Sequence, residues 1–151
     1  AWYWFDPSCS CKMARGLNVI DGHEYLLGDY GLANGWVLDG ALWYYGSNGE
    51  VLNGWQWING AWYYFNTSGY RQTGWVRVDR QWYYLNGDGV MTTGWQLVGG
   101  QWYYMNGSGE MQTGWQAVGG RWYYMGSNGV MYANTWTPDG RYVDGSGAWV
   151  Q

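Results

Sequence analysis

The sequence predicts an all-β fold, a solenoid (superhelix) of stacked two-stranded hairpins with about 20 residues per repeat. The first observation is a series of tryptophans that each follow a glycine at steps of 19 or 20 residues: Trp36, Trp55, Trp75, Trp95 and Trp115. The second is a Trp-Tyr-Tyr triplet that starts seven residues after each of them: Trp43, Trp62, Trp82, Trp102 and Trp122. The third is composition, since 22% aromatic residues and 27 glycines leave few aliphatic residues for a globular core.

Turn dipeptides separate the two aromatic positions and favour a hairpin over a helix with seven-residue spacing. Such pairs supply the positive φ angles of tight hairpin turns. The flanking segments are short and rich in strand-favouring residues. In the first full hairpin the dipeptide stands one residue earlier, which predicts that Trp36 faces Trp43 directly. The pairs are Asp39-Gly40, Asn59-Gly60, Gly99-Gly100 and Gly119-Gly120.

The register of a hairpin decides which rings share a face. With the turn at residues 99–100, Trp95 lies opposite Tyr104. Because side chains alternate along a strand, Trp95 and Trp102 point to one face and Tyr103 points to the other. Each hairpin therefore shows two tryptophans to one neighbour and its middle tyrosine to the other.

The repeats are regular only in the middle of the chain. Leu17 and Tyr25 replace the two tryptophans in an early copy, so no full cage is expected there, and Arg141 stands in a tryptophan position of the last copy. The chain begins inside a repeat, which predicts a piece of a longer, exported protein. The predicted parts are degenerate N-terminal repeats in residues 1–34, regular aromatic repeats in 35–133 and a degenerate C-terminal capping repeat in 134–151.

Composition excludes several classes of function. A net charge of −4 with only 7 Lys and Arg argues against nucleic acid, whose binding needs cations at phosphates. No apolar run approaches the roughly 20 residues of a membrane span. Cys9 and Cys11 are interpreted as incidental loop residues, and His23 has no evident nucleophile partner. Neither a metal, a cofactor nor an enzymatic activity is predicted.

Two tryptophans from one hairpin and a tyrosine from the next can wall a small space. Such a cage suits a quaternary ammonium through cation–π attraction and burial of its methyl groups. Two alternatives stay open. The rings could form a packed core without a ligand, or they could stack on sugar rings with help from Gln56, Gln96 and Gln116.

Gly-Trp, seven residues, Trp-Tyr-Tyr, then a glycine and often a methionine resembles the choline-binding (cell-wall-binding) repeat of Gram-positive bacteria and their phages. The resemblance implies that cages between successive hairpins bind choline groups of teichoic acids. Met91, Met111 and Met131 would be fourth walls, and the copies with Val51 and with Tyr70-Arg71 depart from this pattern. The implied cages are Trp36, Trp43 and Tyr63; Trp55, Trp62 and Tyr83; Trp75, Trp82 and Tyr103; Trp95, Trp102 and Tyr123; and Trp115, Trp122 and Tyr142.

The resemblance also sets the expected context. It implies a non-catalytic module at the bacterial cell wall or cell surface, bacterial or phage-encoded, with a cell-wall hydrolase as the expected upstream part. Choline or phosphocholine on teichoic acid is the expected partner, and a glucan or other carbohydrate is the alternative. The third tyrosine of each triplet is an alternative cage wall to the middle one. The terminal repeat is expected to cap the stack or to mediate a homodimer.

Overall fold

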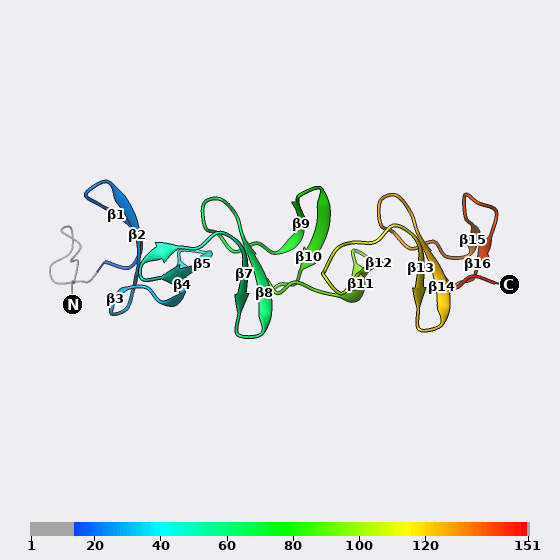
Figure 1. Cartoon of the computed structure of the whole chain (residues 1–151), viewed down its shortest axis with the longest axis horizontal. Helices are drawn as coiled ribbons and strands as arrows, with labels where there is room; N and C mark the ends of the chain where they lie inside the picture. Colours follow the sequence, from blue (N-terminus) through cyan, green and yellow to red (C-terminus); the bar gives the residue numbers. More distant parts are fainter. Residues whose placement is uncertain (1–13, 151) are drawn as a thin grey trace. The chain divides into compact units, whose positions relative to one another are not determined.

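The structure is a computed structural model that describes residues 14–150. All of its regular elements are β-strands (Figure 1). Cys9 and Cys11 lie outside the described residues. The strands are β1 (Gly16–Ile20), β2 (His23–Gly28), β3 (Gly31–Leu32), β4 (Gly35–Asp39), β5 (Leu42–Ser47), β6 (Glu50–Val51), β7 (Gly54–Ile58), β8 (Ala61–Phe65), β9 (Gly74–Val78), β10 (Gln81–Leu85), β11 (Gly94–Val98), β12 (Gln101–Met105), β13 (Gly114–Val118), β14 (Arg121–Met125), β15 (Thr135–Trp136) and β16 (Tyr142–Val143).

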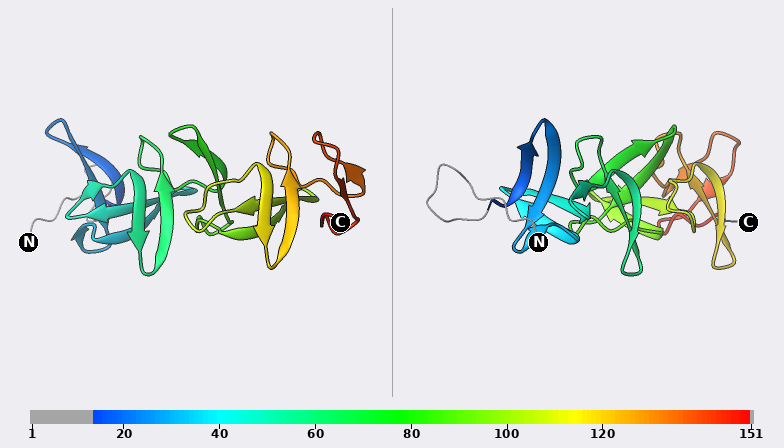
Figure 2. Two further views of the ribbon diagram at one scale, coloured as in Figure 1. Left: turned by 45° about the vertical axis from the view of Figure 1, so that its right-hand side comes forward. Right: turned by 60° about the vertical axis from the view of Figure 1, so that its left-hand side comes forward.

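The chain divides into two compact units. Within the described residues, the first unit holds residues 14–73 and 88–90, and the second holds residues 74–87 and 91–150. The first contains β1 to β8 and the second β9 to β16. Figure 2 shows the paired strands of the hairpins in each unit from two further directions. Each unit is built from antiparallel hairpins, as predicted.

The predicted register is confirmed in the hairpin β11–β12. Trp95 pairs with Tyr104, and Leu97 pairs with Trp102. The hairpins β7–β8, β9–β10 and β13–β14 have the same register, because in each of them the tryptophan that follows the glycine pairs with the third residue of the Trp-Tyr-Tyr triplet. The repeat in the sequence is therefore a repeat in backbone pairing.

The first full hairpin differs from its prediction. Trp36 pairs with Tyr45, not with Trp43, which lies opposite Leu38. The turn falls on residues 40–41 because Gly40 takes the first turn position with a φ of 60°, where a type II′ turn needs a glycine. The hairpin thus keeps the register of the others, and the two tryptophans still share a face.

The early copy is also shifted by one position from its prediction. Leu17 pairs with Leu26 and Asn18 pairs with Tyr25, because the two-residue turn lies at 21–22. Tyr25 therefore occupies the middle position of the triplet, and Glu24 occupies the position of the second tryptophan. The early copy carries neither cage tryptophan.

Within each unit, backbone hydrogen bonds tie the loop after a hairpin to the preceding hairpin. The loop that follows a hairpin returns to the preceding one, where the N–H of Met111 donates to the carbonyl of Trp82 at 2.8 Å. Met131 and Trp102, and Arg71 and Trp43, repeat this bond at 2.8 Å. Such nearest-neighbour contacts are how repeat proteins gain stability beyond that of one marginal hairpin.

A thin core runs along the ends of the second strands. Phe65, Leu85, Met105, Met125 and Val143 end these strands and are fully buried. Each also bridges to the residue six positions later, which belongs to the returning loop. Burial of this one position per repeat therefore joins the hairpin to the loop that follows it. Between residues 14 and 150 the structure has no helix long and apolar enough to cross a membrane.

Candidate ligand-binding cages

The clearest candidate site lies in the second unit, and we name it the Trp75 cage. The ring centroids of Trp75 and Trp82 are 6.3 Å apart with an interplanar angle of 88°. The ring of Tyr103 lies 4.8 Å from that of Trp75 at 65°. These rings border a cavity of about 410 Å³ whose lining is Trp75, Trp82, Tyr103, Met111, Ser127 and Asn128.

Two further sets of residues repeat this geometry. In the Trp95 cage, Trp95 and Trp102 are 6.3 Å apart at 90°, and Tyr123 lies 4.9 Å from Trp95 at 75°. In the Trp36 cage, the corresponding distances are 6.2 Å to Trp43 at 87° and 4.9 Å to Tyr63 at 71°. The two walls from one hairpin are therefore nearly perpendicular in all three cages.

Backbone pairing explains why the middle tyrosine, and not the third, comes from the next hairpin. The third tyrosine pairs across the strands of its own hairpin, so Tyr84 lies 5.2 Å from Trp75 and supports that ring from the side. The middle tyrosine points to the opposite face and meets the tryptophan of the preceding hairpin. The third tyrosine therefore positions the first tryptophan and the middle tyrosine adds a wall.

The second tryptophan of each cage is accessible to solvent. Trp43, Trp82 and Trp102 are 36%, 40% and 42% exposed, whereas the first tryptophan of each cage is half-buried. A ring packed only as core would be covered. An exposed outer wall beside a cavity allows a ligand to enter from solvent.

The returning loop supplies a fourth wall. The residue at the fourth-wall position donates its backbone N–H to the carbonyl of the second tryptophan. This residue is Met111 in the Trp75 cage and Met131 in the Trp95 cage. The loop itself is fixed locally, because Asn106 Oδ1 accepts from the backbone N–H groups of Ser108 and Glu110. This Asx-type turn fixes the backbone immediately before Met111.

Arginine takes the fourth-wall position of the Trp36 cage. The guanidinium carbon of Arg71 lies 5.9 Å from the ring centroid of Trp36 and 5.8 Å from that of Trp43. Both distances fall within the range of a cation–π contact. The cavity of this cage, about 300 Å³, is lined by Trp36, Trp43, Tyr63, Arg71 and Asp88.

The last predicted set is arranged differently. Tyr142 pairs with Trp136, and their rings lie 5.3 Å apart, because the final hairpin is shorter than the others. Trp149 lies against Trp115 instead, at 6.2 Å. Trp122 and Trp149 line a separate cavity of about 350 Å³.

Sequence reasoning missed Trp149, although a signal was present. The segment from Asp144 to Trp149 repeats the pattern of the segment from Asn106 to Met111, with Gly-Ser-Gly at the same places. The carboxylate Oδ1 of Asp144 accepts from the backbone of Ser146 as Asn106 does in its own loop. Trp149 thereby holds the fourth-wall position, and its N–H donates to the carbonyl of Trp122 at 2.8 Å.

An arginine also lies over the tryptophans of this last set. The guanidinium carbon of Arg141 is 5.4 Å from the ring of Trp115 and 5.2 Å from that of Trp149. Asp139 pairs with Arg141 at 3.5 Å and accepts a hydrogen bond from Trp115 Nε1 at 3.0 Å. Hydrogen bonds from Thr137 and Trp115, with a smaller effect of Arg141, lower the pKa of Asp139.

The remaining predicted set has members in both units. Trp55 and Trp62 belong to the first unit, and Tyr83 and Met91 belong to the second, so this cage stays a prediction. Trp55 lies 5.1 Å from Tyr64 within its own hairpin, as the first tryptophan does in the other repeats. Burial, with smaller effects of nearby carboxylates, raises the pKa of Tyr83.

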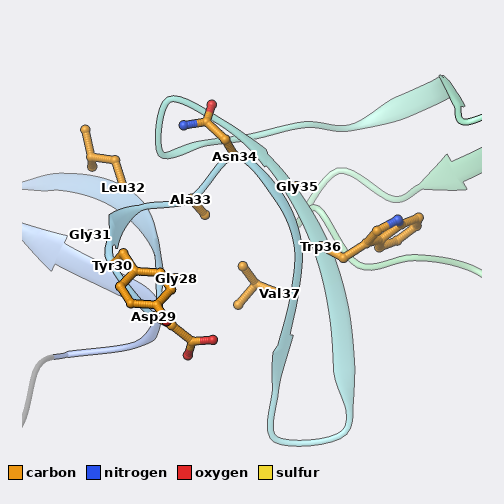
Figure 3. A pocket seen from close by; sticks show the side chains of 10 residues that line it. All are labelled: Gly28, Asp29, Tyr30, Gly31, Leu32, Ala33, Asn34, Gly35, Trp36 and Val37. Carbon is orange, nitrogen blue, oxygen red and sulfur yellow. The ribbon is translucent and has the colours of Figure 1, made fainter.

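A further cavity, of about 190 Å³, is formed by residues 28–37 and has no aromatic cage. Figure 3 shows the ring of Trp36 pointing away from Val37 and from the other lining residues. Tyr30 also lines this cavity and is 93% exposed. Within residues 14–150 no three His, Cys, Asp or Glu side chains gather as metal ligands.

Comparison with known proteins accounts for the repeated cage. A family model described as the choline-binding repeat matches residues 52–93 and 92–136, which together are 85 of the 151 residues. The chain belongs to the choline-binding repeat family. The family predicted from the Gly-Trp and Trp-Tyr-Tyr pattern is thereby confirmed. A search of curated protein sequences gave no match.

Solved structures of choline-binding proteins are similar to this chain. Choline binding protein F from Streptococcus pneumoniae is 37% identical with a TM-score of 0.82, over 99% of this chain and 54% of that chain. CbpJ from Streptococcus pneumoniae is 40% identical with a TM-score of 0.81, over 92% of this chain and 49% of that chain. The modular autolysin LytC from Streptococcus pneumoniae, solved with a synthetic peptidoglycan ligand, is 32% identical with a TM-score of 0.68, over 86% of this chain and 33% of that chain. The chain thus spans about half the length of the first two proteins.

Proposed function

We propose that this chain is a non-catalytic module that binds the choline groups of teichoic acids, one group per open cage. The observation that carries the proposal is the Trp75 cage, where near-perpendicular indole faces and a tyrosine border an accessible cavity. A quaternary ammonium has no N–H to donate, so electron-rich ring faces are the groups that recognise it. The net charge of −4 also favours a cationic ligand.

The hydrogen bonds of three glutamines argue against the carbohydrate alternative. Gln56, Gln96 and Gln116 follow the Gly-Trp pair and were the candidates for donors to sugar hydroxyls. Each amide already donates to a backbone carbonyl three residues earlier, at 2.7, 3.0 and 3.0 Å. The family match also favours choline over a glucan. A packed core without ligand does not account for a cavity of about 410 Å³ beside an exposed tryptophan.

The energetics of one cage require several of them to act together. A single aromatic contact with a cation contributes about 0.5–2 kcal/mol. A three-ring cage should bind free choline with a dissociation constant of about 1 mM, or about 4 kcal/mol. Several cages on one chain gain affinity for a polymer through effective concentration. The module therefore suits attachment to a cell wall that repeats its choline groups.

The cellular setting follows from the ligand. Teichoic acids lie in the cell wall, so we propose that the module acts at the surface of a bacterium, whether the bacterium or a phage encodes it. One of the similar structures is a modular autolysin, which is consistent with a role in attaching a hydrolase to its substrate. Attachment is the contribution of this chain.

The test compares ligands of matched shape. We expect choline to quench tryptophan fluorescence and to raise the melting temperature at millimolar concentrations. The neutral isostere 3,3-dimethylbutan-1-ol should bind at least tenfold more weakly, since it keeps the methyl groups but lacks the charge. Glucose oligomers should have no effect. A response to the oligomers alone would overturn the proposal.

A cage variant assigns the signal to its residues. Trp102→Ala removes an outer wall that is 42% exposed, so the fold should persist while one choline site is lost. Trp136→Ala is the matched control, because Trp136 is 66% exposed and contacts Tyr142 outside the cages. Equal choline binding by Trp102→Ala and the unchanged chain would contradict the assignment.

A further inference from the structure

Two arginines lie where a ligand cation would lie. Arg71 is within 5.9 Å of both tryptophan rings of the Trp36 cage, and Arg141 is within 5.4 Å of both Trp115 and Trp149. In each case one guanidinium faces two indoles. This is the contact that a quaternary ammonium would make with the same rings.

The Trp36 and Trp75 cages form a matched pair. Their tryptophan walls are 6.2 and 6.3 Å apart at 87° and 88°, and their tyrosines lie at 4.9 and 4.8 Å. The fourth-wall residue differs, since Arg71 stands where Met111 stands in the Trp75 cage. The cavity is correspondingly smaller, about 300 Å³ against about 410 Å³.

We propose that the chain covers the tryptophan faces of two of its own sites, with Arg71 and Arg141 as internal cations, and that choline is taken by cages whose fourth wall is methionine. Among the described cages these are the Trp75 and Trp95 cages. The proposal rests on the proposed function and specifies which sites of the module carry it. On this proposal, the residue at the fourth-wall position determines whether a cage binds choline.

The position of Arg71 is fixed by packing as well as by charge. Its backbone N–H donates to the carbonyl of Trp43 at 2.8 Å, and it bridges to the buried Phe65. A Cβ at Gly89 would come within 2.6 Å of Arg71 Cδ, so glycine leaves space for the arginine stem. The guanidinium is thereby held over the rings. A second cation could contact the same faces only by displacing the guanidinium from them.

Arg141 is held by a different set of contacts. Asp139 pairs with it at 3.5 Å and is itself fixed by hydrogen bonds from Trp115 Nε1 and from Thr137 Oγ1. The carboxylate balances the arginine charge beside the two rings. Arg141 therefore covers the faces of Trp115 and Trp149 without a ligand.

Another arginine near a cage does not fill it. Arg77 lies 6.0 Å from the ring of Trp82, with which it pairs across the strands of β9–β10. It is exposed, and the cavity of the Trp75 cage is lined by other residues. One guanidinium at one wall leaves the space between the walls open.

The test follows the indole N–H signals of the full chain by ¹⁵N NMR during a titration with choline. Signals of Trp75 and Trp82 should move with a dissociation constant of about 1 mM, whereas those of Trp36 and Trp43 should respond at least tenfold more weakly. In Arg71→Met the Trp36 and Trp43 signals should titrate like those of Trp75. Similar titration of both cages in the unchanged chain, or no gain in Arg71→Met, would overturn the proposal.

The reciprocal change keeps the proposal testable if Arg71→Met folds poorly. Met111→Arg should close the Trp75 cage and leave the Trp95 signals unchanged, while Arg80→Met at an exposed turn should alter neither. Continued binding at Trp75 in Met111→Arg would refute the role of the arginine. If neither the Trp75 nor the Trp95 signals respond in any variant, the proposed function itself fails.

Discussion

Tyr44 shows how a single buried residue couples this fold to pH. The side chain is 3% exposed, and its ring lies 5.3 Å from that of Tyr70 at 88°. Burial, followed by a hydrogen bond with Tyr70 and by nearby negative charges, raises the pKa of Tyr44 to about 12. The folded state therefore holds this proton more tightly than the unfolded chain, whose tyrosine pKa is about 10.

The stability that comes from this proton is present below pH 10 and is lost as pH rises from about 10 to about 12. We expect the free energy of unfolding, measured with urea, to fall by about 2 kcal/mol across this range through Tyr44. Tyr44→Phe should flatten that fall. Tyr30→Phe is the control, because Tyr30 is 93% exposed. An unchanged pH dependence in Tyr44→Phe would contradict the account.

The residues that wall the cages could be predicted wherever the repeat is regular. Strand alternation and a two-residue turn are enough to place Trp95, Trp102 and Tyr123 around one space. Arg71 was recognised as a departure from the methionine pattern, but spacing does not reveal that its guanidinium reaches two rings. Long side chains have many rotamers, and packing selects among them.

At the scale of the element, the hairpin turn decides the register. Most turns here have two residues with positive φ, and in β9–β10 these are Asp79 and Arg80, with φ of 48° and 71°. A non-glycine residue in this region costs about 1–2 kcal/mol. The hairpin tolerates this cost because its register matches that of its neighbours.

Arg80→Gly should therefore stabilise the protein. Relief of the positive φ exceeds the greater entropy of glycine in the unfolded chain, so we expect a net gain of about 0.5–1 kcal/mol. The measurement is the midpoint of guanidinium unfolding. Arg121→Gly is the matched control, because Arg121 pairs with Val118 within the strands β13–β14 and glycine should destabilise it there. A lower midpoint for Arg80→Gly would show that the arginine stabilises the turn.

Hairpins were predictable where the turn dipeptide is unambiguous and less so at the ends of the series. Gly40 was assigned to the second turn position, yet it takes the first, which keeps the register of its neighbours. In the last copy, Trp136 pairs with Tyr142 six residues later, and the turn between them contains Thr137 hydrogen bonds that no repeat shares. A contact that occurs in a single element leaves no periodic signal in the sequence.

At the scale of the whole molecule, weak cages gain strength by number. Each open cage is expected to bind free choline at about 1 mM, but a second cage engages a tethered choline group at an effective concentration in the millimolar range. Loss of one cage should therefore remove one site for free choline, yet weaken binding to a choline-bearing polymer by about tenfold.

We expect Trp82→Ala to raise the apparent dissociation constant for an immobilised choline-bearing polymer by about tenfold, and Trp82→Ala with Trp102→Ala to raise it by about 100-fold. Both tryptophans are outer walls, 40% and 42% exposed, so the fold should tolerate the changes. Surface plasmon resonance gives the polymer affinity, and calorimetry gives the number of free choline sites. Trp136→Ala should change neither. If polymer affinity fell only in proportion to the number of sites that remain, the cages would bind independently. Effective concentration would then not explain the binding of the polymer.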